Sequence, residues 1–127
     1  MQDANKKIVS FTDLVVWQYG HSFVVEIYKI TKSFPKHEMY GIVSQLRRAA
    51  SSVTSNIAEG FSRFSFKDKA RFYYNSRGSL SECQNHILIS KDVGYLPSDQ
   101  AASLFQKADK IRQILNGLIK STESRVK

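Results

Sequence analysis

The chain has 127 residues, 42% of them hydrophobic and 24% charged, which suits one globular domain, is too short for two, and argues against a disordered chain. Its formal net charge is +8, from 19 Lys and Arg residues against 11 Asp and Glu residues. Such a balance attracts polyanions, so RNA, DNA and anionic membrane surfaces are all partners that the charge admits.

The sequence contains two prolines and six glycines, and this scarcity favours long helices over many short strands. The first predicted helix begins at Thr12, whose hydroxyl can cap it, and ends at Phe34, because the residue before a proline avoids the α region. The second opens at Pro35, a residue suited to the first turn of a helix. Gly60 is predicted to end this helix as a left-handed cap. The apolar stripe between them consists of Met39, Ile42, Leu46, Ala49, Val53 and Ile57.

The third predicted helix starts after Ser65, which has the spacing of a capping box with Asp68, and stops at Gly94. Ser98 is predicted to cap the fourth helix, which runs to the tail. Helices of roughly 20 residues joined by short turns pack as antiparallel neighbours. The sequence therefore predicts an all-α fold, an antiparallel up-down four-helix bundle in which residues 1–127 form one domain. Residues 1–10 and 121–127 are expected to be short flexible ends.

Cys83 is the only cysteine, which excludes an internal disulfide and suits a reducing cytoplasm. No apolar run approaches the ~20 residues that a membrane span requires. The first residues lack the charged region, apolar core and cleavage site of a signal peptide in the right order. We therefore expect a cytoplasmic protein that is not inserted in a membrane.

Three runs of consecutive apolar residues spread around more of the helix circumference than one core-facing stripe can bury. They are Phe23-Val24-Val25, Phe72-Tyr73-Tyr74 and Ile87-Leu88-Ile89. Three consecutive residues cover about 200° of a helix. Because soluble monomers avoid large exposed apolar patches, a second copy of the chain is the simplest cover. The candidate residues of this oligomer interface are Phe23, Val25, Tyr73, Tyr74 and Leu88.

Residues that support catalysis or metal binding are not grouped in the sequence. His21, His37 and His86 lie on different predicted segments. Cys83 and His86 share a helix face, but no second pair completes a zinc site, so a buried cysteine beside a partly exposed histidine is the better interpretation. Gly78 is isolated and is better explained by close helix packing than by a phosphate-binding loop. A Ser–His–acid triad stays open, because its members need only meet in space. We expect no enzymatic activity, no metal and no cofactor.

The stretch from residue 47 to residue 77 is the candidate nucleic-acid-binding site. Its two acidic residues are Glu59 and Asp68. Its seven basic residues are Arg47, Arg48, Arg63, Lys67, Lys69, Arg71 and Arg77. Phe61, Phe64 and Phe66 are interleaved with these charges. Cations contact phosphates and aromatic rings stack on unpaired bases, so the mixture suits single-stranded or looped RNA.

Alternatives to this interpretation remain open. The phenylalanines can close the end of the bundle while the charges are only solvated. Some arginines can also pair internally, Arg47 with Glu82 on the third predicted helix and Arg71 with Glu59. An arginine held in this way would be removed from a binding surface.

Several short motifs occur in order between about residue 11 and residue 119, and together they resemble a known family. The motifs are Phe11, Asp13-Leu14, Val16-Trp17-Gln18, Phe34-Pro35, Glu38, Tyr40-Gly41, Gln45-Leu46-Arg47-Arg48-Ala49, Asn56-Ile57-Ala58-Glu59-Gly60, Gly78-Ser79-Leu80, Glu82 and Gly94-Tyr95-Leu96. The chain resembles the small four-helix bundle proteins that are encoded in intervening sequences of bacterial large-subunit ribosomal RNA genes and are often labelled as ribosomal proteins. Tyr73, Tyr74 and Ser76 depart from the residues common in that family, and they lie on packing faces.

The resemblance implies an antiparallel four-helix bundle that assembles into a homopentamer, and it implies no catalytic residues. It also implies similarity to the accessory protein of diversity-generating retroelements, a basic pentamer that binds nucleic acid and a reverse transcriptase. The leading hypothesis is a non-enzymatic homo-oligomer that binds nucleic acid, RNA rather than DNA. The rival hypothesis is an oligomeric scaffold whose main partner is another protein, such as a reverse transcriptase.

Overall fold

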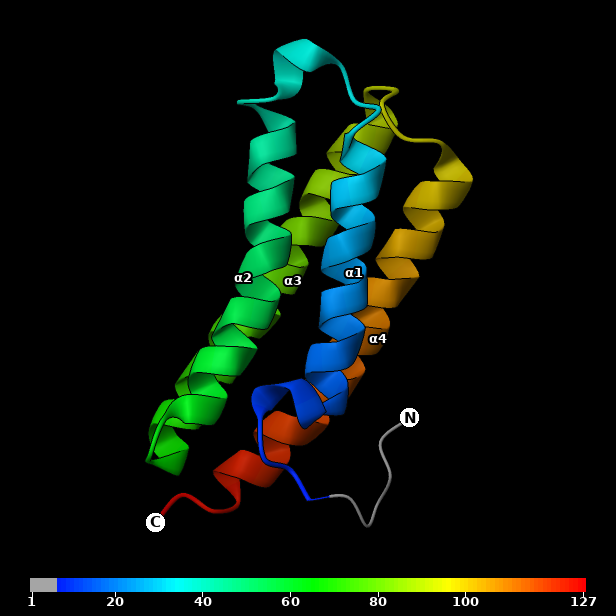
Figure 1. Ribbon diagram of the computed structural model, residues 1–127. Coiled ribbons are helices and arrows are strands. Elements are labelled where there is room, and N and C mark those ends of the chain that lie inside the picture. Colours follow the sequence, from blue (N-terminus) through cyan, green and yellow to red (C-terminus); the bar gives the residue numbers. More distant parts are fainter. Residues whose placement is uncertain (1–6) are drawn as a thin grey trace.

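Four helices run alternately up and down one bundle in the computed structural model, which describes residues 7–127 (Figure 1). The helices are α1 (Val15–Thr31), α2 (Ile42–Ser62), α3 (Phe66–Asp92) and α4 (Ser98–Glu123), and two short 3-10 turns are η1 (Phe11–Asp13) and η2 (Lys36–Glu38). No strand occurs within residues 7–127. The predicted all-α four-helix fold is confirmed.

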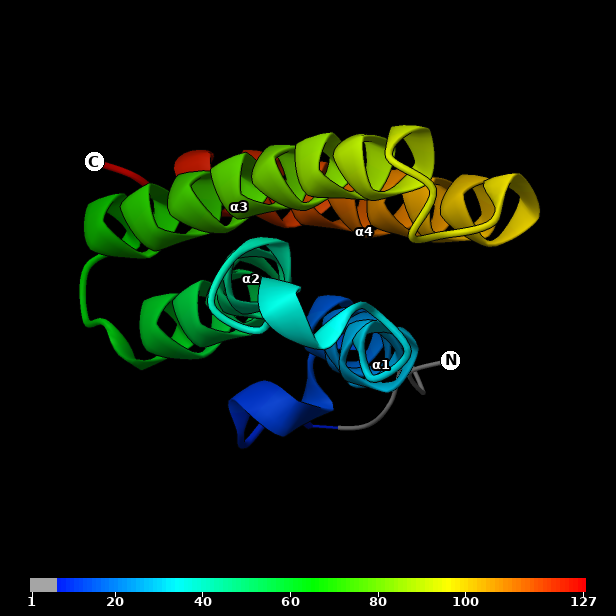
Figure 2. The same ribbon diagram turned by 90° about the horizontal axis from the view of Figure 1, so that it is seen from above.

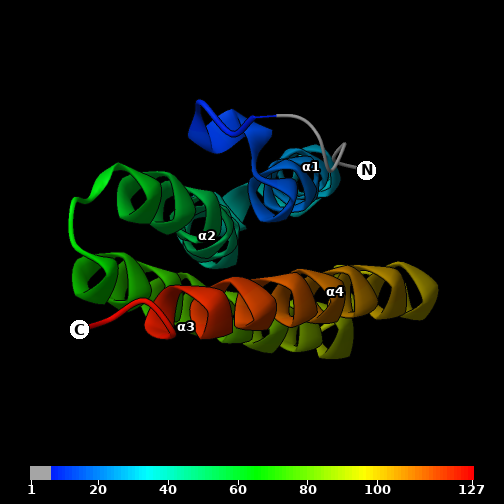
Figure 3. The ribbon, with the colours of Figure 1, turned by 90° about the horizontal axis from the view of Figure 1, so that it is seen from below.

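The helices form two layers, α1 with α2 and α3 with α4 (Figures 2 and 3). Each helix packs on the next one along the chain, and α1 also packs on α4, which closes the bundle. The α2–α3 pair makes the most extensive contact and the α1–α4 pair the least. The largest of the completely buried side chains in the core are Phe23, Ile27, Leu46, Ile57, Leu80, Ile87, Leu104, Ile111 and Leu115.

The N-terminal cap is Ser10 rather than the predicted Thr12. Ser10 accepts a hydrogen bond from the backbone N–H of Thr12 at 3.2 Å, and the carboxylate of Asp13 accepts from the backbone N–H of Ser10 at 3.0 Å. This capping box belongs to η1, and α1 begins at Val15 after an extended Leu14. The flexible end was predicted for residues 1–10, and these hydrogen bonds hold its last residue, Ser10, in place. Residues 1–6 lie outside the described residues.

The connection between α1 and α2 is longer than predicted, because α1 ends at Thr31 and α2 begins only at Ile42. Pro35 precedes η2 instead of opening α2, and Met39 is 47% exposed instead of lying on the core stripe. Glu38 holds this connection in place. Its carboxylate accepts a 2.7 Å hydrogen bond from the Tyr95 hydroxyl, and this bond lowers the pKa of Glu38.

Gly60 is not a left-handed cap, because α2 continues through it to Ser62. Its role is close packing: a β-carbon at Gly60 would lie 2.7 Å from Cε1 of Tyr73 and 3.0 Å from Cβ of Phe72 on α3. Gly78, for which close packing was predicted, has no neighbouring atom within 4 Å of such a carbon. Gly94 does adopt a positive φ of 88°, which ends α3 at the predicted place.

The caps of α3 and α4 differ. Ser65 accepts a 3.1 Å hydrogen bond from the backbone N–H of Asp68, which confirms the predicted start of α3. At α4 the residue in the cap position is Pro97, without a side-chain hydrogen bond, and Ser98 is already helical, so the predicted Ser98 cap is wrong. Helix α4 also continues to Glu123, beyond the predicted start of the tail at residue 121.

Within residues 7–127, no helix has both the length and the apolar character that a transmembrane span requires.

Candidate nucleic-acid interface

The seven basic residues predicted between positions 47 and 77 lie in different parts of the bundle. Arg47 and Arg48 lie near the start of α2, whereas Arg63 lies just after its end (Figure 1). The fifteen residue steps from Arg48 to Arg63 correspond to about 22 Å along the helix axis. The predicted stretch is therefore not one surface.

Arg47 connects α2 to the end of α1. Its Nε donates to the Thr31 hydroxyl at 2.9 Å, its Nη2 donates to the Tyr28 carbonyl at 3.3 Å, and its guanidinium lies 4.8 Å from the centre of the Tyr28 ring. The alternative in which Arg47 pairs with Glu82 is not what the structure has, and the Glu82 carboxylate lies 3.3 Å from His86. These contacts occupy Arg47 within the fold, while the neighbouring Arg48 is exposed.

Arg63 and Arg71 converge on one aromatic ring at the other end. Each guanidinium carbon lies 4.6 Å from the centre of the Phe72 ring, so the two carbons are at most about 9 Å apart. Arg63 pairs with Glu59 at 3.8 Å and Arg71 pairs with Asp68 at 3.7 Å, in place of the alternative in which Arg71 pairs with Glu59. Both arginine side chains remain substantially exposed, and ion pairs of this kind are worth only ~0–1 kcal/mol. They can therefore exchange a carboxylate for a phosphate.

Lys69 and Arg77 are engaged in the fold. Lys69 Nζ donates to the Phe61 carbonyl at 2.6 Å, and partial burial lowers the pKa of this ammonium group. Lys69 therefore satisfies a carbonyl that the last turn of α2 leaves without a partner. Arg77 donates to the Asn116 side chain at 3.0 Å and lies over the Tyr74 ring at 4.7 Å, so it links α3 to α4. Because these contacts occupy both side chains, we no longer count Lys69 and Arg77 among the residues of the candidate interface.

Two basic residues that the sequence did not indicate join this end of the bundle. The chain after α4 lies at the end of the bundle where α3 begins, as Figures 1 to 3 show. Arg125 lies over the Phe66 ring at 5.6 Å, and Lys127 lines a shallow pocket together with Lys67 and Arg71. About fifty residues of sequence separate the two segments, so only the fold could bring them together.

We call this surface the basic end and define it as Arg63, Lys67, Arg71, Arg125 and Lys127. The segments that form it, residues 59–71 and 120–127, contain seven basic and three acidic side chains, a net +4 out of the chain's +8. The acidic residues Glu59, Asp68 and Glu123 contact Arg63, Arg71 and the Tyr74 hydroxyl respectively. Half of the net charge is therefore concentrated at one end of the molecule.

The predicted oligomer interface separates into buried and exposed members. Phe23 and Tyr73 are each only 2% exposed and belong to the core of this chain, and burial raises the pKa of Tyr73 to about 12. A partner could not reach them without opening the bundle, so they leave the candidate interface. Val25, Tyr74 and Leu88 are exposed and remain available.

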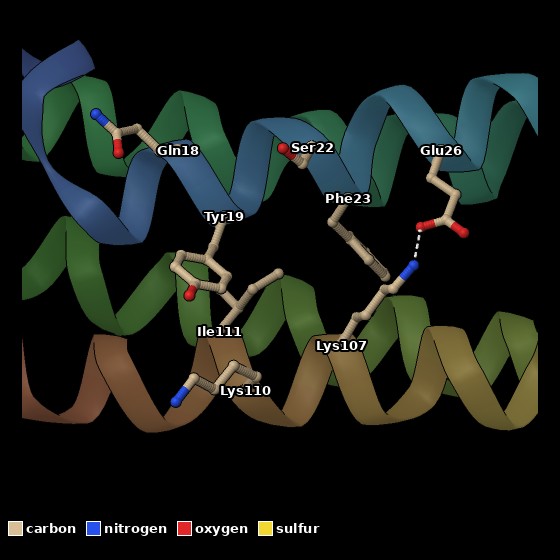
Figure 4. Close-up of a pocket in the computed structure, with 8 residues that line it drawn as sticks. All are labelled: Gln18, Tyr19, Ser22, Phe23, Glu26, Lys107, Lys110 and Ile111. Carbon is tan, nitrogen blue, oxygen red and sulfur yellow. Dashed lines mark hydrogen bonds and ion pairs between the residues drawn. The ribbon is translucent and has the colours of Figure 1, made fainter. Parts of the chain in front are cut away.

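A groove of about 390 Å³ lies between α1 and α4 (Figure 4). Phe23 and Ile111 form its apolar part, and the Lys107 ammonium group lies 2.7 Å from the Glu26 carboxylate, which bridges the two helices. The only carboxylate that lines the groove is thus already paired with a cation.

Cys83 and His86 occupy neighbouring positions on α3. Cys83 is fully buried, and burial raises the pKa of its thiol to about 12. His86 is 7% exposed, which corrects the prediction of a partly exposed histidine, and its Nε2 lies 3.3 Å from Glu82. Among residues 7–127, His, Cys, Asp and Glu form no group of three or more that could hold a metal ion.

The fold and the basic end together define a small four-helix bundle protein whose net positive charge is concentrated at one end. The family model of the 23S rRNA-intervening sequence protein matches residues 12–117, so the chain belongs to this family. No curated protein matches the chain in sequence. A crystal structure of a protein of unknown function from the S23 ribosomal protein family of Bacteroides thetaiotaomicron is similar in fold. It has a TM-score of 0.78 and 20% identity, and the match covers 84% of this chain and 96% of that one.

Proposed function

We propose that this chain binds nucleic acid, RNA rather than DNA, through the basic end, and that it acts in the cytoplasm by binding and not by catalysis. The observation that carries the proposal is the convergence of Arg63, Lys67, Arg71, Arg125 and Lys127 at one end of the bundle. The aromatic residues among these cations suit the unpaired bases of single-stranded or looped RNA, which favours RNA over duplex DNA. Phosphates dominate the affinity of such surfaces, and the sequence of the bases contributes little.

Salt dependence is the direct test of this proposal. If the five cations of the basic end each neutralise one phosphate, the logarithm of the association constant falls with the logarithm of salt concentration with a slope near −3.5 per chain. Affinity for a labelled single-stranded RNA should then fall roughly 100-fold between about 50 and about 200 mM salt. Fluorescence anisotropy titrations over this range measure the slope. A slope near zero would contradict an electrostatic site.

We also propose that the chain is a homo-oligomer, with a pentamer favoured by the family resemblance. Val25, Tyr74 and Leu88 are 38–41% exposed, and their apolar surface is of the kind that a second copy covers. Light scattering at micromolar concentration should give a multiple of the 14.5 kDa chain mass. Leu88→Glu should shift the mass towards the monomer, whereas Met39→Glu, on the exposed α1–α2 connection, should not. A wild-type monomer would contradict this proposal.

The same exposed apolar residues support a second candidate function. The bundle would be an oligomeric scaffold or accessory protein whose main partner is another protein, such as a reverse transcriptase. In that case an apolar substitution such as Leu88→Glu would abolish partner binding, while loss of the basic end would leave partner binding unchanged.

A further inference from the structure

The turn between α2 and α3 displays one phenylalanine to solvent. Phe64 is 100% exposed, whereas the other aromatic residues of this end are covered to different degrees. Phe61 lies under the Lys69 ammonium group, Phe66 lies under Arg125, and Phe72 lies under Arg63 and Arg71. Within residues 7–127, Phe64 makes no contact with another ring or with a cation. The alternative in which Phe64 closes the end of the bundle is therefore wrong.

The backbone on both sides of Phe64 is held in place. On the α2 side, the N–H of Arg63 donates to the Gly60 carbonyl at 3.2 Å, and Lys69 donates to the Phe61 carbonyl. On the α3 side, the Ser65 hydroxyl caps the helix through the Asp68 N–H. Arg63 and Ser65 are both extended, with ψ near 150°. The ring is thus presented on an anchored three-residue connection, which lowers the entropy lost when a ligand packs on it.

The charges around Phe64 select the ligand. Arg63 precedes it directly, and Lys67 follows one residue into α3, with Arg71 one turn further along. An exposed aromatic face with cations at neighbouring positions of the turn and of α3 matches a ligand with a flat, weakly polar group and a negatively charged backbone. Unpaired nucleobases have this combination, because the base stacks on the ring while the flanking phosphates meet the cations. In a duplex the base faces are already stacked and cannot be reached in this way.

We infer that Phe64 is a stacking platform for an unpaired nucleobase, so that the basic end takes single-stranded or looped RNA in preference to duplex RNA. This inference rests on the proposed function and adds to it the class of nucleic acid. It also assigns different tasks to the residues of the turn. Arg63, Lys67 and Arg71 provide affinity for any phosphate backbone, and Phe64 provides the preference for unpaired bases.

The test compares one unstructured single-stranded RNA with the duplex that it forms with its complement. Stacking of a base on an aromatic residue is worth ~1–3 kcal/mol, so Phe64→Ala should weaken single-strand binding by roughly 5- to 150-fold and leave duplex binding unchanged. Phe64→Trp should keep the preference, and its added fluorescence should be quenched by the single strand. Tyr40 is 96% exposed in the α1–α2 connection at the opposite end, and Tyr40→Ala is the matched control, expected to bind both RNAs as the wild type does.

Three results would overturn the inference. One is unchanged single-strand binding by Phe64→Ala, and another is an equal loss for single strand and duplex. The third is a change in oligomer mass in Phe64→Ala by light scattering, which would place the ring between copies of this chain. Absence of binding to either RNA by the wild-type protein is a different result, because it would overturn the proposed function itself.

Discussion

Reversal of three charges at the basic end, Arg63→Glu, Lys67→Glu and Arg71→Glu, is expected to weaken RNA binding by roughly 50-fold or more near physiological salt. Loss of three phosphate contacts alone accounts for roughly 50-fold on single strands at about 0.15 M salt, and the new carboxylates add repulsion. Lys69 is left unchanged in this variant, because its ammonium group satisfies the carbonyls at the end of α2. The measurement is an anisotropy titration, and the residual binding should depend less steeply on salt.

A control with the same change of charge separates a local site from the net charge of the molecule. Lys32, Lys36 and Arg48 are exposed at the opposite end of the bundle, so their replacement by glutamate also lowers the charge by six. This control should lose much less affinity than the basic-end variant. Equal losses would show that the protein attracts RNA only by its overall charge, and a larger loss in the control would place the site at the α1–α2 end.

The basic-end variant must also keep its fold for the comparison to be valid. Arg63 and Arg71 lie over Phe72, and each such contact is worth ~0.5–1 kcal/mol at an exposed site. The helices themselves are held by core residues that the substitutions do not touch. Circular dichroism should therefore show unchanged helicity and a modest decrease in melting temperature.

The helices were predictable because each carries a local pattern that agrees with the fold. The spacing of Leu46, Val53 and Ile57 indicates one buried face, and all three are completely buried. The caps were less predictable, because several residues compete for each position. Ser10 and Thr12 lie two residues apart and both carry a hydroxyl that can cap a helix. The choice between them depends on which backbone N–H donates to the Asp13 carboxylate, and in the structure it is that of Ser10.

The candidate site was only partly predictable, because a position in the sequence does not show what a long side chain contacts. Arg47 and Arg63 look equivalent in the sequence, yet one is bonded to Thr31 and the other is exposed at the end of the bundle. The sequence did not indicate Arg125, because Arg125 comes close to Phe66 only through the antiparallel packing of α4 on α3. Phe23 and Tyr73 were assigned to an interface because consecutive apolar residues do not show which member of a run faces the core.

Substitution of Gly60 by alanine is expected to destabilise the bundle, although alanine is the better helix former. The intrinsic preference favours alanine by ~1 kcal/mol. Against this, the new methyl carbon would lie 2.7 Å from Cε1 of Tyr73 and 3.0 Å from Cβ of Phe72. Tyr73 is 2% exposed and has no room to turn away, and Cβ of Phe72 moves only with the backbone of α3. Overpacking of this kind costs ~1–3 kcal/mol, so after the gain in helix preference the free energy of unfolding should fall by up to about 2 kcal/mol.

Gly78→Ala and Gly117→Ala are the matched substitutions, because both glycines are helical and neither has an atom within 4 Å of an added β-carbon. Each should raise the free energy of unfolding by ~0.5–1 kcal/mol, since alanine has less backbone freedom to lose in the unfolded chain. Urea denaturation of the three variants under one set of conditions gives the ranking. A Gly60→Ala variant as stable as Gly117→Ala would mean that α2 and α3 do not approach closely at this glycine. The ranking therefore tests the packing that positions Arg63 beside Phe72, and with it the geometry of the basic end.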